Sequence, residues 1–368
     1  MANYFHLKNE TNVSTVASEE KTPLLSRTEC NIMRGFAIII IIIDNLTHSF
    51  HGVYKDNEFN FFWSSVQGFL NNLSHPDNLL LFNVISFFCP YGVMLFIFLS
   101  GYGLTLKYEK GNGLGTSHKD FIFSHYKKMF TMHAKGFALF LMVLLIIDPH
   151  IIVGGTHTIL QILLLGNLNP SQIISPGPYW FFGMIMEMYV IYRLIIYRRS
   201  DSTAIALCIL SLFVMAFTDP EGEILRYLRN NCFLAILPFC MGVLTARHLN
   251  YKSLSINKPL ICFGWFILSF ILLTLSKFNF YSWLFMPIFI IMTAITIVKL
   301  IRKVKILDTI FNWLGALSGV LFVVHPSIRE LLLSRANESG EYYHTVFIFL
   351  FLSIVLSIIL KPVFSGKK

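Results

Sequence analysis

The chain has 368 residues, of which 55% are hydrophobic, 15% are aromatic and only 13% are charged. A soluble globular domain carries roughly 25% charged residues, so this composition excludes the soluble class. Apolar segments of membrane-spanning length follow one another with short connections. We therefore predict a single all-α domain, a polytopic integral membrane protein.

About ten transmembrane helices are expected, because ten segments are apolar and long enough to be candidate spans. They are 33–50, 84–106, 129–148, 178–197, 202–218, 231–247, 259–276, 280–298, 308–328 and 343–361. With an even number of spans, both termini lie on the same side of the membrane. If that side is cytoplasmic, most of the 29 Lys and Arg residues fall on it, as the positive-inside rule requires. The exceptions are Lys55, Arg226, Arg229, Lys277, Arg329 and Arg335.

This distribution accounts for the formal net charge of +9, so the charge does not indicate a nucleic-acid partner. We predict cytoplasmic N- and C-termini and a multi-pass protein of the inner (plasma) membrane.

Three segments divide the chain. Residues 1–29 are polar and mixed in charge, and the apolar run after them has no small-residue cleavage site, which predicts a cytoplasmic segment followed by a retained signal anchor. Residues 30–361 form the transmembrane domain, and 362–368 form a cytoplasmic tail. The cysteines show no CxxC spacing and lie within or beside apolar segments, so we expect them to pack rather than bind metal or form disulfides. They are Cys30, Cys89, Cys208, Cys232, Cys240 and Cys262.

The first span, MRGFAIIIIIIDNLTHSF, contains ionisable residues that are costly inside a membrane. At ~100° per residue, Asn45 lies about 20° from Arg34, His48 about 40° away on the other side and Asp44 about 80° away. These four side chains share half of the helix surface, and Asp44 lies about 15 Å along the axis from Arg34. This pattern favours a polar face that runs from the cytoplasmic mouth into the outer half of the membrane. The structural alternative is that Arg34 and His48 snorkel to the two interfaces.

Three further polar residues interrupt later spans. Ser100 lies in SGYG, where Gly101 and Gly103 permit close helix contact. Glu187 lies mid-span among aromatic residues and requires a partner, for which Arg34 and His48 are candidates. His325 precedes Pro326, so the helix is expected to kink or end there and to leave the ring near the outer interface, in a structural rather than catalytic role.

Three connections are unusual in length or composition. The outward-facing loop 51–79 carries aromatic and acidic residues, Asp56 and Glu58 among them, and is suited to meeting an extracytoplasmic substrate. The segment 149–177 has no Lys or Arg, and its apolar core is too short to span, so it is expected to lie in or along the outer leaflet. The basic loop 107–128 either binds an anionic cytoplasmic ligand or only follows the positive-inside rule.

Several motifs follow one another in order along the chain. They are RGFAIIIIII with a polar cluster after it, FIFLSGYGLTL, a basic HYKK, PYWFFGMIMEMYVIY and LGALSGVLFVVHPSI. This order resembles the bacterial membrane acyltransferase-3 family, over about residues 27–361. The resemblance implies a ten-helix membrane enzyme that moves an acyl group, commonly acetyl, from cytoplasmic acyl-coenzyme A to a hydroxyl of a surface or envelope glycan.

The resemblance also assigns roles to residues of the first span. In the family, an arginine and a histidine about three helical turns apart are essential. Arg34 matches the arginine, whereas Asp44 and Asn45 stand where the histidine is expected. Three alternatives follow: His48 is the base, Asp44 is the base, or this chain has lost acyl transfer. Glu187 would fix the orientation or charge of the base.

Donor binding is expected on the basic side. Acyl-CoA (acetyl-CoA) is the donor substrate that the resemblance implies, with its phosphates drawn to Lys127, Lys128 and Lys119. In the family this basic motif usually holds two arginines and a proline, for which the chain has HYKKMFTMHAK. Arg34 would orient the pantetheine or pyrophosphate.

The developing oxyanion needs a hydrogen-bond donor, and Ser100, Asn45 or Tyr102 could supply it. A glycan or lipid-linked sugar is the expected acceptor, and membrane lipids are the other expected partners. No bound cofactor, metal or nucleic acid is expected, and the sequence does not predict the oligomeric state.

Three rival interpretations remain open. A different class of membrane acyltransferase, acting on a lipid or protein, would centre on His325. A secondary transporter would also explain intramembrane Arg, Asp and Glu. A catalytically silent relative would serve as a partner in glycan export or synthesis.

Overall fold

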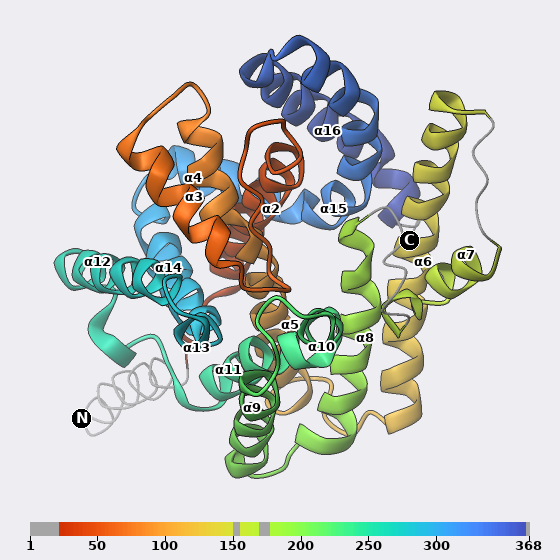
Figure 1. Ribbon diagram of the computed structural model, residues 1–368. Coiled ribbons are helices and arrows are strands. Elements are labelled where there is room, and N and C mark those ends of the chain that lie inside the picture. Colours follow the sequence, from red (N-terminus) through yellow and green to blue (C-terminus); the bar gives the residue numbers. More distant parts are fainter. Residues whose placement is uncertain (1–21, 150–154, 169–176, 366–368) are drawn as a thin grey trace, which may run out of the picture.

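The computed structural model describes residues 22–149, 155–168 and 177–365. Within these ranges the chain is helical and contains no β-sheet, only one isolated bridge between Pro23 and Asn250 (Figure 1). The α-helices are α2 (Arg27–Thr47), α3 (Trp63–Ser74), α4 (Leu80–Phe88), α5 (Gly92–Tyr108), α6 (His118–Ile147), α7 (Gly155–Ile162), α8 (Trp180–Ile191), α9 (Asp201–Ala216), α10 (Glu223–Asn230), α11 (Cys232–His248), α12 (Pro259–Ser276), α13 (Phe280–Trp283), α14 (Met286–Ile301), α15 (Lys305–Ser339) and α16 (Tyr342–Ser365). Short 3-10 or π turns lie at Cys89–Tyr91, Gly166–Leu168, Gly177–Tyr179, Tyr192–Ile196 and Ser253–Ser255.

The all-helical, multi-pass architecture predicted from the sequence is present, and each of the ten predicted spans falls on one or two helices. Six helices in the described residues are long and apolar enough to cross a membrane, or seven if α10 and α11, which meet at a 45° bend, count as one span. The predicted number of about ten crossings therefore remains a prediction. The helices α9 and α14 are apolar but shorter than the six.

Two connections contain helix that the sequence did not predict. The helix α6 begins at His118, so the second half of the predicted loop 107–128 is helical. Ser117 caps this helix by accepting a hydrogen bond from the Asp120 amide at 3.0 Å. The predicted loop 51–79 contains α3, which packs with α4 beside the end of α2 (Figure 1).

The first helix begins in a capping box. Ser26 accepts a hydrogen bond from the Glu29 amide, and the Glu29 carboxylate accepts one from the Ser26 amide. Glu29 is also paired with the buried Lys299 of α14, at 2.8 Å. These contacts fix where α2 enters the bundle and hence the position of its far end.

Close packing between α2 and α15 depends on two glycines. A Cβ added to Gly35 would overlap the backbone oxygen of Phe311, and one added to Gly315 would overlap that of Asn31. Small residues let two helix backbones approach in this way. Gly101 of α5 makes the same kind of contact with α11, as expected from the sequence, whereas Gly103 faces open space.

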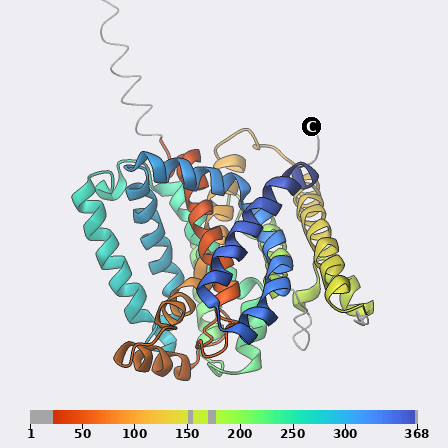
Figure 2. The same cartoon turned by 90° about the horizontal axis from the view of Figure 1, so that it is seen from above.

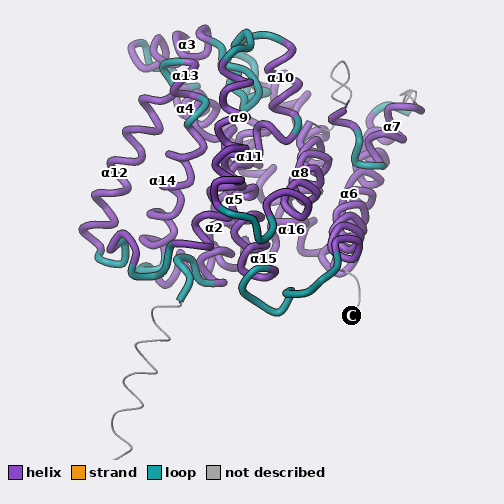
Figure 3. The backbone as a smooth tube through the Cα atoms, turned by 90° about the horizontal axis from the view of Figure 1, so that it is seen from below, coloured by secondary structure: helices purple, strands orange, loops and turns teal. Residues whose placement is uncertain are grey.

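The described ends of the chain lie at the same end of the bundle. Tyr342 at the start of α16 stacks on Phe50, just beyond the end of α2, with ring centroids 4.4 Å apart. α16 therefore returns toward the end at which α2 begins, as Figure 2 shows. In Figure 3, α3, α10 and α13 gather at the opposite end. The assignment of these two ends to cytoplasm and exterior remains a prediction.

Candidate active site

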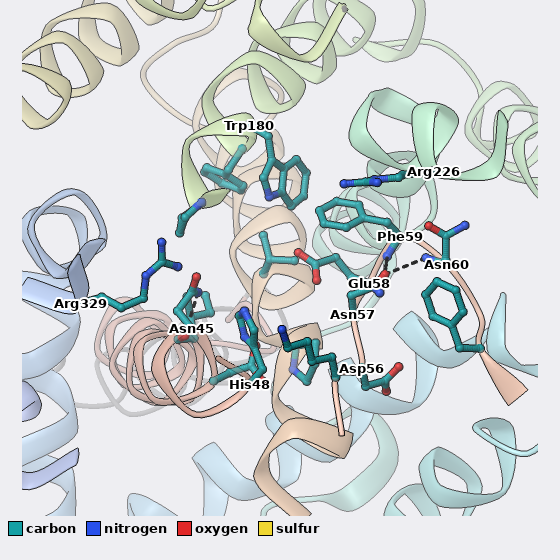
Figure 4. Close-up of a pocket in the computed structure, with 18 of the residues that line it drawn as sticks. Asn45, His48, Asp56, Asn57, Glu58, Phe59, Asn60, Trp180, Arg226 and Arg329 are labelled. Atoms are coloured by element: carbon teal, nitrogen blue, oxygen red, sulfur yellow. Dashed lines mark hydrogen bonds and ion pairs between the residues drawn. The ribbon is translucent and has the colours of Figure 1, made fainter. Parts of the chain in front are cut away.

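A cavity of about 400 Å³ opens at the end of the bundle where α2 terminates. Its lining side chains come from α2, the loop after it, the start of α5 with the turn before it, α8 with the turn before it, α10 and α15, and Figure 4 draws most of them. The polar and charged lining residues are Asp44, Asn45, His48, Lys55, Asp56, Asn57, Glu58, Asn60, Arg226 and Arg329, and the aromatic ones are Phe59, Phe62, Trp180, Phe181 and Phe322.

Three predicted residues of the first span meet in this cavity. Asp44, Asn45 and His48 all line it, from the last turns of α2. The Oδ2 atom of Asp44 lies 3.7 Å from Nδ1 of His48, one turn along the helix. Oδ1 of the buried Asp44 has no hydrogen-bond partner among the described residues. Asn45 donates its amide to Ile41 at 3.0 Å, which leaves its side-chain oxygen for the cavity.

The loop after α2 forms one wall of the cavity. Asn57 turns the chain by accepting hydrogen bonds from the Phe59 and Asn60 amides, both at 2.8 Å. The side chain of Asn60 is buried and donates to the carbonyls of Pro220 and Gly222, at 3.3 and 3.0 Å. The loop is thereby attached to the connection before α10.

Glu58 points into the cavity from this loop (Figure 4). Its backbone oxygen accepts a hydrogen bond at 2.6 Å from the buried Arg229, whose guanidinium lies 4.1 Å from the ring centroid of Trp283. Burial raises the pKa of the Glu58 carboxyl to about 8, and the negative charge of Asp44 adds to the rise. Glu58 is therefore mostly protonated at neutral pH.

Asp56 is neutralised by a buried cation. Lys277, which is 2% exposed, forms an ion pair with Asp56 and donates to the hydroxyl of Tyr91 at 2.8 Å. Trp283 donates to the same hydroxyl at 2.9 Å, and that hydroxyl donates to Asp56 at 3.2 Å. The attraction between two buried charges offsets their desolvation cost only when further hydrogen bonds satisfy them, as here. The network joins the loop to the end of α12 and to the turn before α5.

Aromatic side chains from the loop, α8 and α15 also line the cavity. Phe59 meets Trp180 edge to face with centroids 5.0 Å apart, and Phe181 contacts Phe322 at 5.3 Å. Phe96 of α5 contacts both Phe181 and Phe322 at 6.5 Å. Phe181 and Phe322 form the floor of the cavity, and Phe96, which is not part of the lining, packs against both. In the described part of the chain no three His, Cys, Asp or Glu residues are grouped to hold a metal ion.

Comparison with known protein families identifies the family of the chain. The model of an acyltransferase domain, that of the acyltransferase-3 family, matches residues 27–361. This chain belongs to the acyltransferase-3 family. A search of curated proteins and a search of solved structures each found no match.

Family membership makes the protein a membrane acyltransferase in general terms. The sequence expectations about the class are confirmed by this match and by the apolar helices. The acyl group, the donor and the acceptor need separate argument.

Arg34 does not reach the cavity. Its Nη1 atom donates to Asn31 at 2.9 Å, and Tyr189 lies within electrostatic reach of both Arg34 and Ser100. The Ser100 hydroxyl donates to the Phe96 carbonyl at 2.9 Å. In this acyltransferase-3 chain, Arg34, Ser100 and Tyr189 thus form a second polar group. Phe96 connects this group to the cavity floor, because its ring packs against Phe181 and Phe322.

Glu187 has partners other than those that the sequence suggested. Its two carboxylate oxygens accept hydrogen bonds from the side chain of Asn167 at 2.5 Å and from the Cys232 amide at 2.8 Å. Asn167 also donates to Asn231 at 2.8 Å. Neither Arg34 nor His48 contacts Glu187 in the described residues, which corrects the expected charge relay. Glu187 instead caps the start of α11 at the bend between α10 and α11.

Tyr102 is placed differently from the expected oxyanion donor. It is buried, and its hydroxyl accepts from the Leu25 amide at 2.9 Å and donates to the Leu25 carbonyl at 3.1 Å. It therefore anchors the chain before α2. Lys127 and Lys128 are exposed on α6, outside any described cavity.

His325 corrects the expectation of a helix end. α15 continues through Pro326 to Ser339, and His325 is fully buried rather than at an interface. Its Nδ1 atom lies 3.0 Å from the Leu321 carbonyl, and its Nε2 has no partner among the described residues. The ring contacts Phe322, with centroids 6.0 Å apart, so it packs next to the cavity floor.

Sequence reasoning missed the basic and aromatic members of the site. Arg226 and Arg329 were treated only as exceptions to the positive-inside rule. Their predicted position on the outer side was the signal that could have found them, because a cation there needs a local reason. Lys277 carried the same signal, whereas Trp180 carried none, since it does not lie near the other site residues in the sequence.

Proposed function

We propose that this membrane acyltransferase moves an acyl group, acetyl in the first place, from acyl-CoA to a hydroxyl group of a surface or envelope glycan, and that the cavity binds the acceptor. The observation that carries the proposal is the Asp44–His48 pair inside a polar and aromatic cavity. A carboxylate beside one ring nitrogen orients a histidine so that the other nitrogen can act as a base.

His48 is the base in this proposal. Nδ1 of His48 lies 3.7 Å from Asp44 and has no hydrogen-bond partner among the described residues, so a small shift of the ring would let Asp44 accept from it. Nε2 then takes the proton from the acceptor hydroxyl. The hydroxyl oxygen attacks the thioester carbonyl carbon, the C–S bond breaks, and the coenzyme thiolate leaves and takes up a proton. The side-chain NH2 of Asn45 has two N–H groups, one of which donates to the Ile41 carbonyl. The other could donate to the oxyanion.

Arg34 serves the donor in this proposal. It lies about 15 Å along α2 from Asp44, within electrostatic reach of Tyr189. The thioester must pass from this group to the cavity, and the contacts that connect the two run from Ser100 through Phe96 to Phe181 and Phe322. The pantetheine arm would displace these rings, because aromatic side chains can rotate whereas the helix backbones cannot. Lys127 and Lys128 would attract the donor phosphates only as an exposed basic surface.

Mass spectrometry of ester-linked acyl groups on surface glycans tests the proposal. A deletion strain would be restored with the wild-type chain, Arg34→Ala, Asp44→Ala or His48→Ala. We expect one ester to disappear on deletion and to return only when Arg34 and His48 are intact. Identical glycans in every strain would favour a silent partner or a transporter.

A further inference from the structure

The cavity has more positive charge than its acidic side chains balance. Lys55, Arg226 and Arg329 all line it. Of the three lining acids, Asp56 is paired with Lys277. Glu58 holds its proton at neutral pH, because burial raises its pKa to about 8. Among the described lining residues only the charge of Asp44 then opposes the three cations, and Glu330, which is outside the lining, pairs with Arg329. Two cations remain without an ion pair to a described residue.

Both arginines have guanidinium groups available to a ligand. Arg329 uses Nε and Nη2 to bind Glu330, at 3.2 and 2.6 Å, and its Nη1 has no hydrogen-bond partner in the described part of the chain. Arg226 is exposed on α10 and makes no ion pair with a described residue. Figure 4 shows the two reaching in from α15 and α10 on opposite sides, with Trp180 between them.

The remaining lining suits a sugar ring. Trp180 and Phe59 offer apolar ring surfaces, and the amides of Asn45 and Asn57 lie at the same cavity. A few convergent polar groups among aromatic walls are typical of small-ligand sites. The volume of about 400 Å³ is within the usual range of such pockets.

We propose that the cavity selects a saccharide bearing an anionic substituent, a carboxylate or a phosphate, which Arg226 and Arg329 bind. The inference rests on the proposed function, since it names the chemical class of the acceptor. Arginine binds carboxylate and phosphate through paired hydrogen bonds. A neutral sugar would leave Arg226 without an anionic partner and Arg329 with Glu330 alone.

Binding of three sugars that differ only at C6 tests the inference. Glucose, glucuronate and glucose 6-phosphate would be titrated against the full chain in lipid nanodiscs by calorimetry at pH 7. We expect one anionic sugar to bind about tenfold to a hundredfold more tightly than glucose, and the better one distinguishes carboxylate from phosphate. Arg226→Gln should remove most of that preference and Arg226→Lys should keep part of it.

Arg335→Gln is the matched control, because Arg335 is exposed on α15 outside the cavity. It should leave all three affinities unchanged. The inference is overturned if the three sugars bind equally, if none binds, or if the preference survives in both Arg226→Gln and Arg329→Gln.

Acetyl transfer is measured in the same preparation to separate the two proposals. A charge preference without any ester formed from acetyl-CoA would leave the anion site standing and contradict the proposed function. Equal esterification of glucose and glucuronate would leave the function standing and contradict the anion selectivity.

Discussion

At the scale of single residues, substitutions in the cavity can identify which side chain acts as the base. His48→Ala in the purified protein should lower the rate of acyl transfer about 10²- to 10⁴-fold, because a general base contributes that much. The rate is measured by release of the coenzyme thiol in the presence of acceptor. His51→Ala is the control, since His51 is exposed three residues further on and does not line the cavity. Full activity of His48→Ala together with loss in Asp44→Asn would identify Asp44 as the base.

Glu58 makes stability depend on pH. Its pKa is about 8 in the folded protein against an ordinary 4.5, so between these values the folded chain binds one proton more than the unfolded chain. The free energy of unfolding therefore falls as pH rises through that window. Glu58→Gln cannot titrate, and its apparent melting temperature should fall less than that of the wild type between pH 5 and pH 8. Glu223→Gln, an exposed substitution on α10, should follow the wild type.

Equal slopes for Glu58→Gln and the wild type would show that the carboxyl is ionised throughout. The cavity would then be less cationic than inferred. The protonation state of Glu58 therefore affects both the stability of the fold and the net charge that the cavity offers to an acceptor.

At the scale of elements, the contact between α2 and α15 sets the distance between His48 and Arg329. Gly315→Ala would place a methyl group against the Asn31 backbone, and overpacking of this kind costs about 1–3 kcal/mol. A lower melting temperature and weaker acyl transfer should result. Gly319→Ala, one turn along α15, meets only the end of Met132 at 3.5 Å and should be neutral or slightly stabilising.

The ion pair between the loop and α12 is a second element-scale contact. Lys277→Met would leave Asp56 buried without its cation, at a cost of about 3–5 kcal/mol. Thermal unfolding in detergent measures this loss of stability, with Lys258→Met at the exposed start of α12 as the control. Adding Asp56→Asn to Lys277→Met should recover part of the loss. A double variant as unstable as the single one would mean that the lysine acts through packing.

At the scale of the whole molecule, the arrangement of the chain can be tested against the predicted topology. A fluorescent protein fused after Lys368 should fluoresce, and alkaline phosphatase fused there should be inactive, because the positive-inside rule predicts a cytoplasmic C-terminus. The same reporters inserted at Asp77, between α3 and α4, should give the opposite result. The reverse pattern would place the cavity on the cytoplasmic side and would make its acceptor an intracellular glycan.

The sequence determined the class of the protein and much of its first span. Composition and apolar period are local properties that persist in any packing of the helices, so the all-helical membrane architecture and the shared face of Asp44, Asn45 and His48 followed from them. The family match over residues 27–361 agrees with the resemblance carried by its motifs.

Only the tertiary structure decided which residues share the cavity. Glu58 and Trp180 lie far apart in the sequence yet meet at one cavity, and Arg329 joins them because α2 and α15 pack closely at Gly35 and Gly315. The sequence suggested that Glu187 pairs with Arg34 or His48, but its carboxylate accepts one hydrogen bond from the Cys232 amide at the start of α11 and one from the Asn167 side chain. Helical periodicity fixes the face of a residue on its own helix, whereas partners depend on how separate helices cross.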